Sequence, residues 1–289
     1  MPELPEVEQV RKSLLPHIKG KKIEQADIRL PRMILSPALP DFICGVEGRS
    51  FADVKRRGKY LLLELDDTNV ILTHLRMTGS LLALPKNAPE PAFGKIRLRL
   101  SGTEDLWFTD LRTFGTMRLL KPSEFSLDKG FSSLGPEPLS KEFTKEYLKA
   151  VLKKSHQAIK SLLLDQRKIA GLGNIYVDEA LAAAGIRPTR AAAGLRGKKV
   201  AALYEAINQV IAQGLRNHGT TFRNYQDAEG KIGNNKDYLL VYGRKGQPCK
   251  SCGSPLKQIK VGGRGSVYCP HCQNSVFLPG TEYFSEARI

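Results

Sequence analysis

The sequence lacks any long apolar segment. Among its 289 residues, no apolar run approaches the roughly 18 residues that a membrane-spanning helix requires. The first residues also lack the basic and then apolar stretch of a secretory signal, because two of the first six are glutamates. We therefore expect a protein without membrane contacts that stays in the cytoplasm.

Acidic side chains are scarce relative to basic ones. Aspartate and glutamate number 29 against 45 lysines and arginines, which gives a net charge of +16 and a pI near 9.7. Such a field attracts polyanions, most commonly nucleic acid; an anionic membrane surface or a charge that serves only solubility are the alternatives. The apolar content of 41% excludes a disordered chain.

Cysteine is also rare, and four of the five cysteines are clustered. Cys249 and Cys252 form one C-x2-C pair, Cys269 and Cys272 form another, and sixteen residues separate the pairs. In a reducing compartment such cysteines are metal ligands rather than disulfides, and four thiolates complete a tetrahedral shell. The spacing predicts one structural Zn²⁺ and no catalytic metal. Cys44 stands alone, where a small buried hydrophobe is the default interpretation.

The segment between the two cysteine pairs predicts a β-hairpin that turns at Gly262-Gly263. Its exposed tip would carry Arg264, and the flanking glycines would let this side chain approach another backbone closely. A solvated turn cation is the alternative for Arg264.

Apolar periodicity changes along the chain. Val7, Val10, Leu14 and Ile18 predict one amphipathic helix that ends at Gly20, and short strands follow from about 22 to 120. The stretches 59–77 and 95–111 each predict a hairpin, and helical patterns begin after a loop rich in Ser, Gly and Pro. The fold class is α+β with several domains. The predicted divisions are a catalytic β-sandwich with its leading helix (1–128), a linker (129–140), a helical domain with a polar loop at about 218–240 (141–240), a zinc finger (241–277) and a C-terminal tail (278–289).

Two glycines interrupt the helical patterns. Gly171 and Gly173 allow a tight turn that exposes backbone N–H groups at the start of the next helix, where phosphates bind. Asn174 would cap that helix or contact a phosphate. Lys153, Lys154 and Lys160 lie just upstream, either as a solvated face or as part of the phosphate site.

Four separated stretches together resemble one enzyme family. They are MPELPEVE at the start, RRGKYLLLEL, DQRKIAGLGNIYVDEAL and GRGSVYCPHCQ in the finger. In this order they are similar to the bacterial formamidopyrimidine-DNA glycosylase and endonuclease VIII family, and PELPEVE favours the branch that acts on oxidised purines. The resemblance implies a β-sandwich and a helix-two-turns-helix domain with a zinc finger, with duplex DNA held in the cleft between them by a monomer.

The resemblance also implies catalytic roles. Pro2, once Met1 is removed, would attack the sugar through its secondary amine and form a Schiff base. Glu3 would be the adjacent acid and base, Lys59 a proton donor in strand cleavage, and Arg264 a phosphate contact that assists the final elimination. For Pro2 and Glu3 the alternative is that they only start a helix, since proline and acidic residues are typical of its first turn. For Lys59 the alternative is a strand-edge lysine.

Further residues would bind DNA according to the same resemblance. Met77, Arg112 and Phe114 would fill the space left by the everted nucleotide, although Met77 and Phe114 also suit a core. Backbone contacts are implied for His74, Lys154, Lys160 and Asn174, with a satisfied core histidine as the alternative for His74. Thr78, at a position where some relatives carry glutamate, and the loop residues Gly219, Thr220 and Thr221 are candidates for lesion recognition.

Two other functions remain open. One is an endonuclease VIII-like glycosylase for oxidised pyrimidines. The other is a zinc-ribbon protein that binds DNA without catalysis; its composition, finger and helical module would be the same, and only the Pro2–Glu3 start argues against it.

Overall fold

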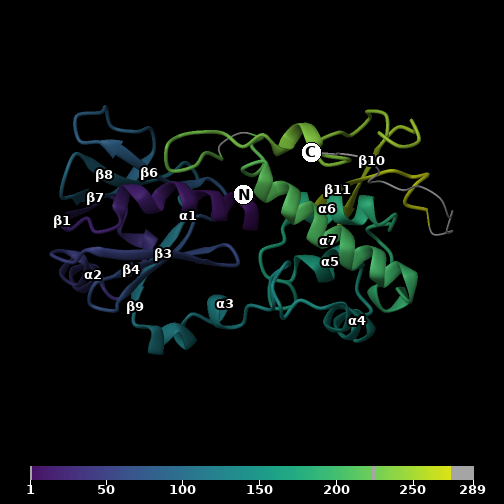
Figure 1. The fold of residues 1–289 in the computed structure, drawn as a ribbon, viewed down its shortest axis with the longest axis horizontal. Helices are drawn as coiled ribbons and strands as arrows, with labels where there is room; N and C mark the ends of the chain where they lie inside the picture. Colours follow the sequence, from purple (N-terminus) through teal and green to yellow (C-terminus); the bar gives the residue numbers. More distant parts are fainter. Residues whose placement is uncertain (1, 223–224, 275–289) are drawn as a thin grey trace. The chain divides into compact units, whose positions relative to one another are not determined.

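The computed structural model describes residues 2–222 and 225–274 and divides into two compact units (Figure 1). The first comprises Met1–Leu134 with Gly214–Lys236, and the second comprises Gly135–Gln213 with Asp237–Ile289. The change of unit after Leu134 falls inside the stretch 129–140, where the sequence predicts a linker. The described part of the polar loop up to Lys236 belongs to the first unit, although the sequence pattern grouped the loop with the helices. The predicted tail and residues 275–277 of the predicted finger lie outside the described residues.

The first unit is built on two β-sheets. One has the strand order β1-β7-β8-β6 and the other the order β2-β9-β5-β4-β3. Both predicted hairpins are confirmed, because β4 pairs with β5 and β7 with β8, each antiparallel. The strands are β1 (Ile23–Ile28), β2 (Ile34–Ser36), β3 (Phe51–Arg57), β4 (Tyr60–Leu65), β5 (Val70–His74), β6 (Gly79–Pro85), β7 (Gly94–Leu100), β8 (Glu104–Asp110) and β9 (Thr116–Leu120).

Helix α1 (Leu4–Ile18) packs against β3 and β4 of one sheet and β6 of the other (Figure 1). Its predicted stripe is fully buried at Val7, Val10, Leu14 and Ile18. These side chains belong to one apolar cluster that includes residues of both sheets. The burial fixes the helix against the sandwich, and its first turn is therefore held in place by the core.

Helix α2 (Leu39–Val46) interrupts the stretch in which the sequence pattern predicted only strands. Phe42 and Val46, four residues apart, are buried, whereas Cys44 lies on another side of the helix and is exposed. The prediction of a buried Cys44 is therefore wrong, because the spacing of a helix turns this residue away from the core.

The second unit contains short helices and a two-stranded sheet. The hairpin of β10 (Lys257–Val261) and β11 (Arg264–Tyr268) turns at Gly262 and Gly263, as predicted. The helices are α4 (Lys145–Lys153), α5 (Ile159–Leu164), α6 (Asn174–Ala183) and most of α7 (Lys198–Arg216); α3 (Lys129–Ser132) belongs to the first unit. Within residues 2–222 and 225–274, no helix is both long and apolar enough to cross a membrane.

Candidate functional site

Pro2 and Glu3 are buried at the start of α1. Glu3 is the residue that precedes the helix, and its backbone N–H donates to Glu6 Oε2 at 2.8 Å. Pro5 stands in the first turn, where its missing N–H costs nothing. The residues typical of a helix N-terminus are therefore present, and they also hold the Pro2–Glu3 backbone in one position.

Glu6 joins this terminus to the polar loop. Its second oxygen, Oε1, accepts the backbone N–H of Thr220 at 2.7 Å. Gly219 has a φ of +83°, and a Cβ there would lie 2.9 Å from Glu6 Cγ, so a side chain would collide with this carboxylate arm. Thr221 donates its hydroxyl to the carbonyl of Tyr225 within the loop. Gly219 and Thr220 thus lie beside Glu6 in the first turn of α1, whereas Thr221 bonds within the loop.

Lys59 occupies the two-residue turn between β3 and β4. Gly58 takes a φ of +58° in this turn, and Lys59 is only 5% exposed. Arg56 donates to the carbonyl of Gly58 at 3.0 Å and also to Glu8 on α1 at 3.0 Å. The turn that carries Lys59 is therefore tied to α1, the helix that Glu3 precedes.

His74 is buried at the end of β5. Burial, with the cations of Arg76 and Lys59 nearby, lowers the pKa of His74 to about 3. The backbone N–H of Arg76 donates to Nδ1 at 2.9 Å, so the ring is neutral with its proton on Nε2. The ring also packs edge-on against Tyr60. A neutral imidazole can still donate one hydrogen bond through Nε2.

Met77, Arg112 and Phe114 lie together on two neighbouring turns. Met77 is 43% and Phe114 50% exposed, so neither is the core residue of the alternative interpretation. Arg112 Nη1 lies 3.0 Å from Met77 Sδ, and its guanidinium carbon lies 4.8 Å from the centre of the Phe114 ring. An exposed thioether, cation and aromatic ring form one cluster. Thr78 follows Met77 directly, and its hydroxyl bonds to Asp110.

The predicted turn before α6 is present. Gly171 has a φ of +91°, and Gln166 fixes the turn through the N–H of Gly171 and the carbonyl of Leu172. Gly173, rather than Asn174, precedes the helix, so the cap expected of Asn174 does not form. Asn174 Nδ2 instead donates to the carbonyl of Gly265. Lys154 is exposed at the end of α4 and suits contact with a phosphate.

Lys160 lies away from the surface that the sequence pattern suggested for it. Its side chain has no exposed area, and Nζ donates to Asp178 Oδ1 and to the carbonyl of Gly265, each at 2.8 Å. Gly265 thus receives hydrogen bonds from both Lys160 and Asn174, and it directly follows the exposed Arg264. In this arrangement Lys160 supports the hairpin that presents Arg264 and does not itself reach a surface.

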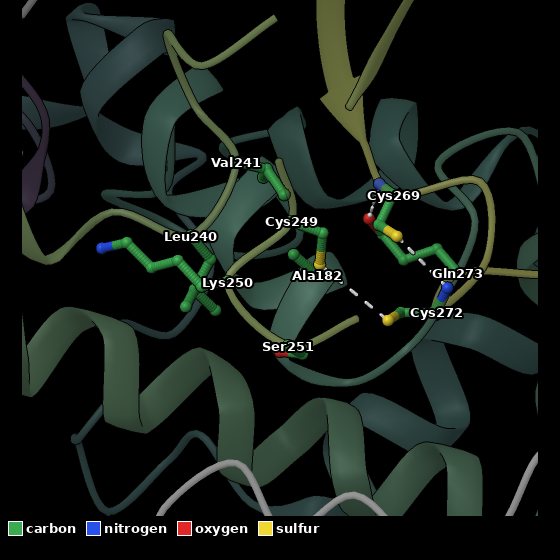
Figure 2. Close-up of a pocket in the computed structure, with 9 residues that line it drawn as sticks. All are labelled: Ala182, Leu240, Val241, Cys249, Lys250, Ser251, Cys269, Cys272 and Gln273. Atoms are coloured by element: carbon green, nitrogen blue, oxygen red, sulfur yellow. Dashed lines mark hydrogen bonds between the residues drawn. The ribbon is translucent and has the colours of Figure 1, made fainter. Parts of the chain in front are cut away.

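The four clustered cysteines form a metal site, and Figure 2 shows three of them, Cys249, Cys269 and Cys272. Their sulfurs all lie within 4.8 Å of one another; Cys249 and Cys272 are 4.0 Å apart, and Cys252 and Cys269 are 3.5 Å apart. Zinc–sulfur bonds of about 2.3 Å in a tetrahedron place sulfurs about 3.8 Å apart. The cluster therefore fits a structural Zn²⁺ with a complete shell of four thiolates.

Two buried residues that the sequence pattern did not single out attach this module to the helices. Glu179 on α6 accepts the backbone N–H groups of Leu240, Val241 and Tyr242. Burial raises the pKa of Glu179, and these three hydrogen bonds oppose that rise. Gln273, seen in Figure 2, accepts from the N–H of Cys269 and donates to the carbonyl of Ile186. Glu179 lies within the stretch DQRKIAGLGNIYVDEAL, and its place in this motif was the sequence signal that could have identified it.

Three family models match the chain. The model of the formamidopyrimidine-DNA glycosylase N-terminal domain matches residues 1–117, and that of its H2TH domain, the helix-two-turns-helix unit, matches residues 134–226. A model described as a zinc finger found in FPG and IleRS matches residues 246–274.

Full-length relatives agree with the models. The chain is 44% identical to formamidopyrimidine-DNA glycosylase of Pelotomaculum thermopropionicum, over 94% of this chain and 99% of that protein. It is 43% identical to the enzyme of the same name from Bacillus licheniformis, again over 94% and 99%. Among solved structures, Lactococcus lactis Fpg in complex with DNA that contains an abasic site has a TM-score of 0.89 at 34% identity, covering 94% of this chain and 100% of that one. The wild-type Lactococcus lactis Fpg with DNA containing N7-benzyl-Fapy-dG has a TM-score of 0.89 at 34% identity, covering 95% of this chain and 100% of that one.

Proposed function

The chain belongs to the formamidopyrimidine-DNA glycosylase family, and from this membership we propose that it is a base-excision repair enzyme. It excises oxidised purines, namely 8-oxoguanine and formamidopyrimidines, from duplex DNA and then cleaves the strand as an abasic-site lyase. The observation that carries the proposal is the buried Pro2–Glu3 start of α1, held through Glu6 beside the polar loop. Binding of DNA alone would not require the terminal amine of Pro2 beside the Glu3 carboxylate.

Pro2 is the proposed nucleophile. Removal of Met1 leaves a secondary amine, and terminal amines titrate at about 8, so a useful fraction is unprotonated at neutral pH. The amine attacks C1′ of the everted nucleotide, the bond from C1′ to the base breaks, and the base departs with a proton supplied by Glu3. Opening of the sugar then gives an iminium between Pro2 and C1′.

The iminium prepares the strand for cleavage. It makes the C2′ proton acidic, and loss of this proton expels the 3′ phosphate by β-elimination. A second elimination expels the 5′ phosphate, water releases Pro2 from the sugar fragment, and a one-nucleotide gap remains. Lys59, on the turn tied to α1, supplies a proton during the first elimination. Arg264 contacts the phosphate and assists the second, while the zinc site holds the hairpin that carries it.

The remaining predicted residues would bind the substrate. Attack on C1′ requires eversion of the nucleotide, which costs a few kcal/mol. Met77 and Phe114 fill the vacated space and Arg112 meets the orphaned base, because these side chains are exposed and already in contact. His74 through Nε2–H, Lys154 and the N-terminus of α6 with Asn174 would contact phosphates, and Gly219, Thr220 and Thr221 would contact the damaged base.

The reaction would take place in the bacterial cytosol, with the protein acting as a monomer. Its relatives are bacterial enzymes. The endonuclease VIII-like alternative shares the chemistry and differs in the base that the pocket accepts, so a comparison of 8-oxoguanine opposite cytosine with thymine glycol separates the two.

Borohydride trapping tests the proposal directly. The wild-type protein should become covalently linked to a duplex with 8-oxoguanine opposite cytosine, because borohydride reduces the iminium to a stable amine. Mass spectrometry should place the link on a peptide that begins with Pro2. Pro2→Gly should weaken or abolish the link, whereas Pro89→Gly, an equal substitution in an exposed loop, should trap like the wild type. Wild-type protein that binds the duplex but is never trapped would refute catalysis, and preferential trapping on thymine glycol would favour the pyrimidine alternative.

A further inference from the structure

Thr78 and Asp110 connect the two turns that carry Met77, Arg112 and Phe114. The last residue of β8 is Asp110, which pairs in register with Gly79, the first residue of β6. The turn with Met77 therefore leads into β6 next to the point where β8 ends and the turn with Arg112 begins. Asp110 is 1% exposed, and the Thr78 hydroxyl donates to its Oδ1.

The hydrogen bonds of this pair converge on the backbone of the second turn. The N–H of Arg112 lies 3.0 Å from Thr78 Oγ1 and 3.1 Å from Asp110 Oδ1, and the N–H of Gly115 donates to Asp110 Oδ2 at 2.7 Å. Thr78 thus donates to the carboxylate and accepts from the same N–H that the carboxylate binds. A buried carboxylate with several donors is a strong anchor, because its charge strengthens each bond.

The second turn needs such an anchor. Thr113, between Arg112 and Phe114, has a φ of +56°, a conformation that is unfavourable for a β-branched residue. Gly115 permits no side chain, because a Cβ would lie 2.4 Å from the Phe108 ring. Exposed Met77 and Phe114 gain little from burial in the protein, so the backbone bonds hold their positions.

From this geometry we propose that Thr78 is a positioning residue: with Asp110 it holds Met77, Arg112 and Phe114 as one preassembled wedge, and it thereby sets discrimination of the base opposite the lesion. The inference rests on the proposed function. It also gives Thr78 a different role from direct recognition of the damaged base, since its hydroxyl proton is donated to Asp110. Preassembly matters because loops that must be ordered at the moment of binding weaken the interaction.

Matched substitutions at Thr78 test the inference. Thr78→Val removes the hydroxyl at nearly constant shape, Thr78→Ser keeps it, and Thr103→Val makes the same change on an exposed turn of the same sheet. Thr78→Val should slow single-turnover excision of 8-oxoguanine opposite cytosine by about ten- to a hundredfold, the loss expected for a hydrogen bond to a charged group. The ratio of excision rates opposite cytosine and opposite adenine should be smaller for Thr78→Val than for the wild type. Thr78→Ser and Thr103→Val should match the wild type.

Cleavage of a single-stranded oligonucleotide with an abasic site provides the contrasting measurement. This substrate has no orphaned base and needs no eversion, so Thr78→Val should cleave it at the wild-type rate. Asp110→Asn should show the same pattern with a larger loss on the duplex. Equal rates and equal opposite-base preference of Thr78→Val and Thr78→Ser would overturn the inference. It would also be overturned if Thr78→Val lost as much activity on the single strand as on the duplex. A changed choice among lesions at constant opposite-base preference would show direct recognition instead. Failure of the wild type to excise at all would refute the proposed function and not this inference alone.

Discussion

Lys160 Nζ lies 2.8 Å from Asp178 Oδ1, and neither side chain has exposed surface. The same carboxylate accepts from the Ser266 hydroxyl and the Val267 N–H on β11. Burial raises the pKa of Asp178, and the neighbouring ammonium opposes that rise. The pair therefore joins α5, α6 and the hairpin that presents Arg264.

Removal of one partner of this pair should be costly. Lys160→Met leaves the Asp178 charge buried without its cation, so the free energy of unfolding should fall by about 3–5 kcal/mol. Urea unfolding measures the loss. Lys160→Met combined with Asp178→Leu should recover part of it, because no isolated charge remains. A single variant as stable as the wild type would show that the pair does not hold the hairpin.

Glu6 should couple the polar loop to the terminus. Glu6→Ala removes the acceptor for the N–H groups of both Glu3 and Thr220, so hydrogen exchange at both amides should accelerate and excision should slow. Gln9 contacts the loop through His218 and Asp227 but does not bond to the Glu3 N–H. Gln9→Ala should therefore accelerate exchange in the loop alone. Unchanged exchange at Glu3 in Glu6→Ala would contradict the coupling.

His74 should make stability depend on pH. Its pKa is lowered to about 3 in the folded protein, whereas an unfolded histidine titrates at about 6.5. The stabilising effect of the neutral ring is complete above 6.5 and declines as pH falls from 6.5 towards 3, because only the unfolded state takes up the proton. When the pH is lowered from 7.5 to 5, the free energy of unfolding should thus fall more for the wild type than for His74→Gln. Nitrogen NMR at pH 5 should show a neutral ring protonated on Nε2; a charged imidazolium there would refute the assignment.

Zinc removal should release the hairpin. The purified protein should contain one zinc per chain by elemental mass spectrometry, and Cys252→Ser should lower that content, because a structural site needs all four thiolates. Chelation should reduce borohydride trapping on lesion duplex, and added zinc should restore it. Cys44→Ser changes an exposed thiol outside the cluster and should alter neither result. Full trapping by metal-free protein would show that formation of the Schiff base needs no support from the zinc site.

Local patterns predicted much of this fold. The hairpins at β4–β5 and β7–β8 follow from alternating apolar residues around polar turns, and the finger follows from cysteine spacing. Helix α2 was missed, because eight residues with an internal proline carry too little periodic signal. The exposed side of that helix, and with it Cys44, could not be inferred without the helix.

The predicted site was less complete because partners far apart in sequence decide burial. A lysine-rich stretch gives no sign that Lys160 turns inward, since Asp178 lies eighteen residues away on another helix. Thr78 and Asp110 are separated by thirty-two residues and meet only because β6 and β8 pair. The sequence alone identified the four cysteines and named Pro2 and Glu3 as candidates, whereas the residues that position them could be identified only from the fold.

The wedge also affects how the protein behaves in solution without DNA. Phe93 and Leu111 are exposed as well; the Phe93 carbonyl accepts from the N–H of Asp110, and Leu111 directly precedes Arg112. Copies of the molecule are kept apart by mutual repulsion at a net charge of +16. Concentrated salt shortens the range of that repulsion to about 3 Å at 1 M. The exposed apolar side chains of neighbouring molecules should then associate, so we expect the protein without DNA to self-associate more readily in concentrated salt.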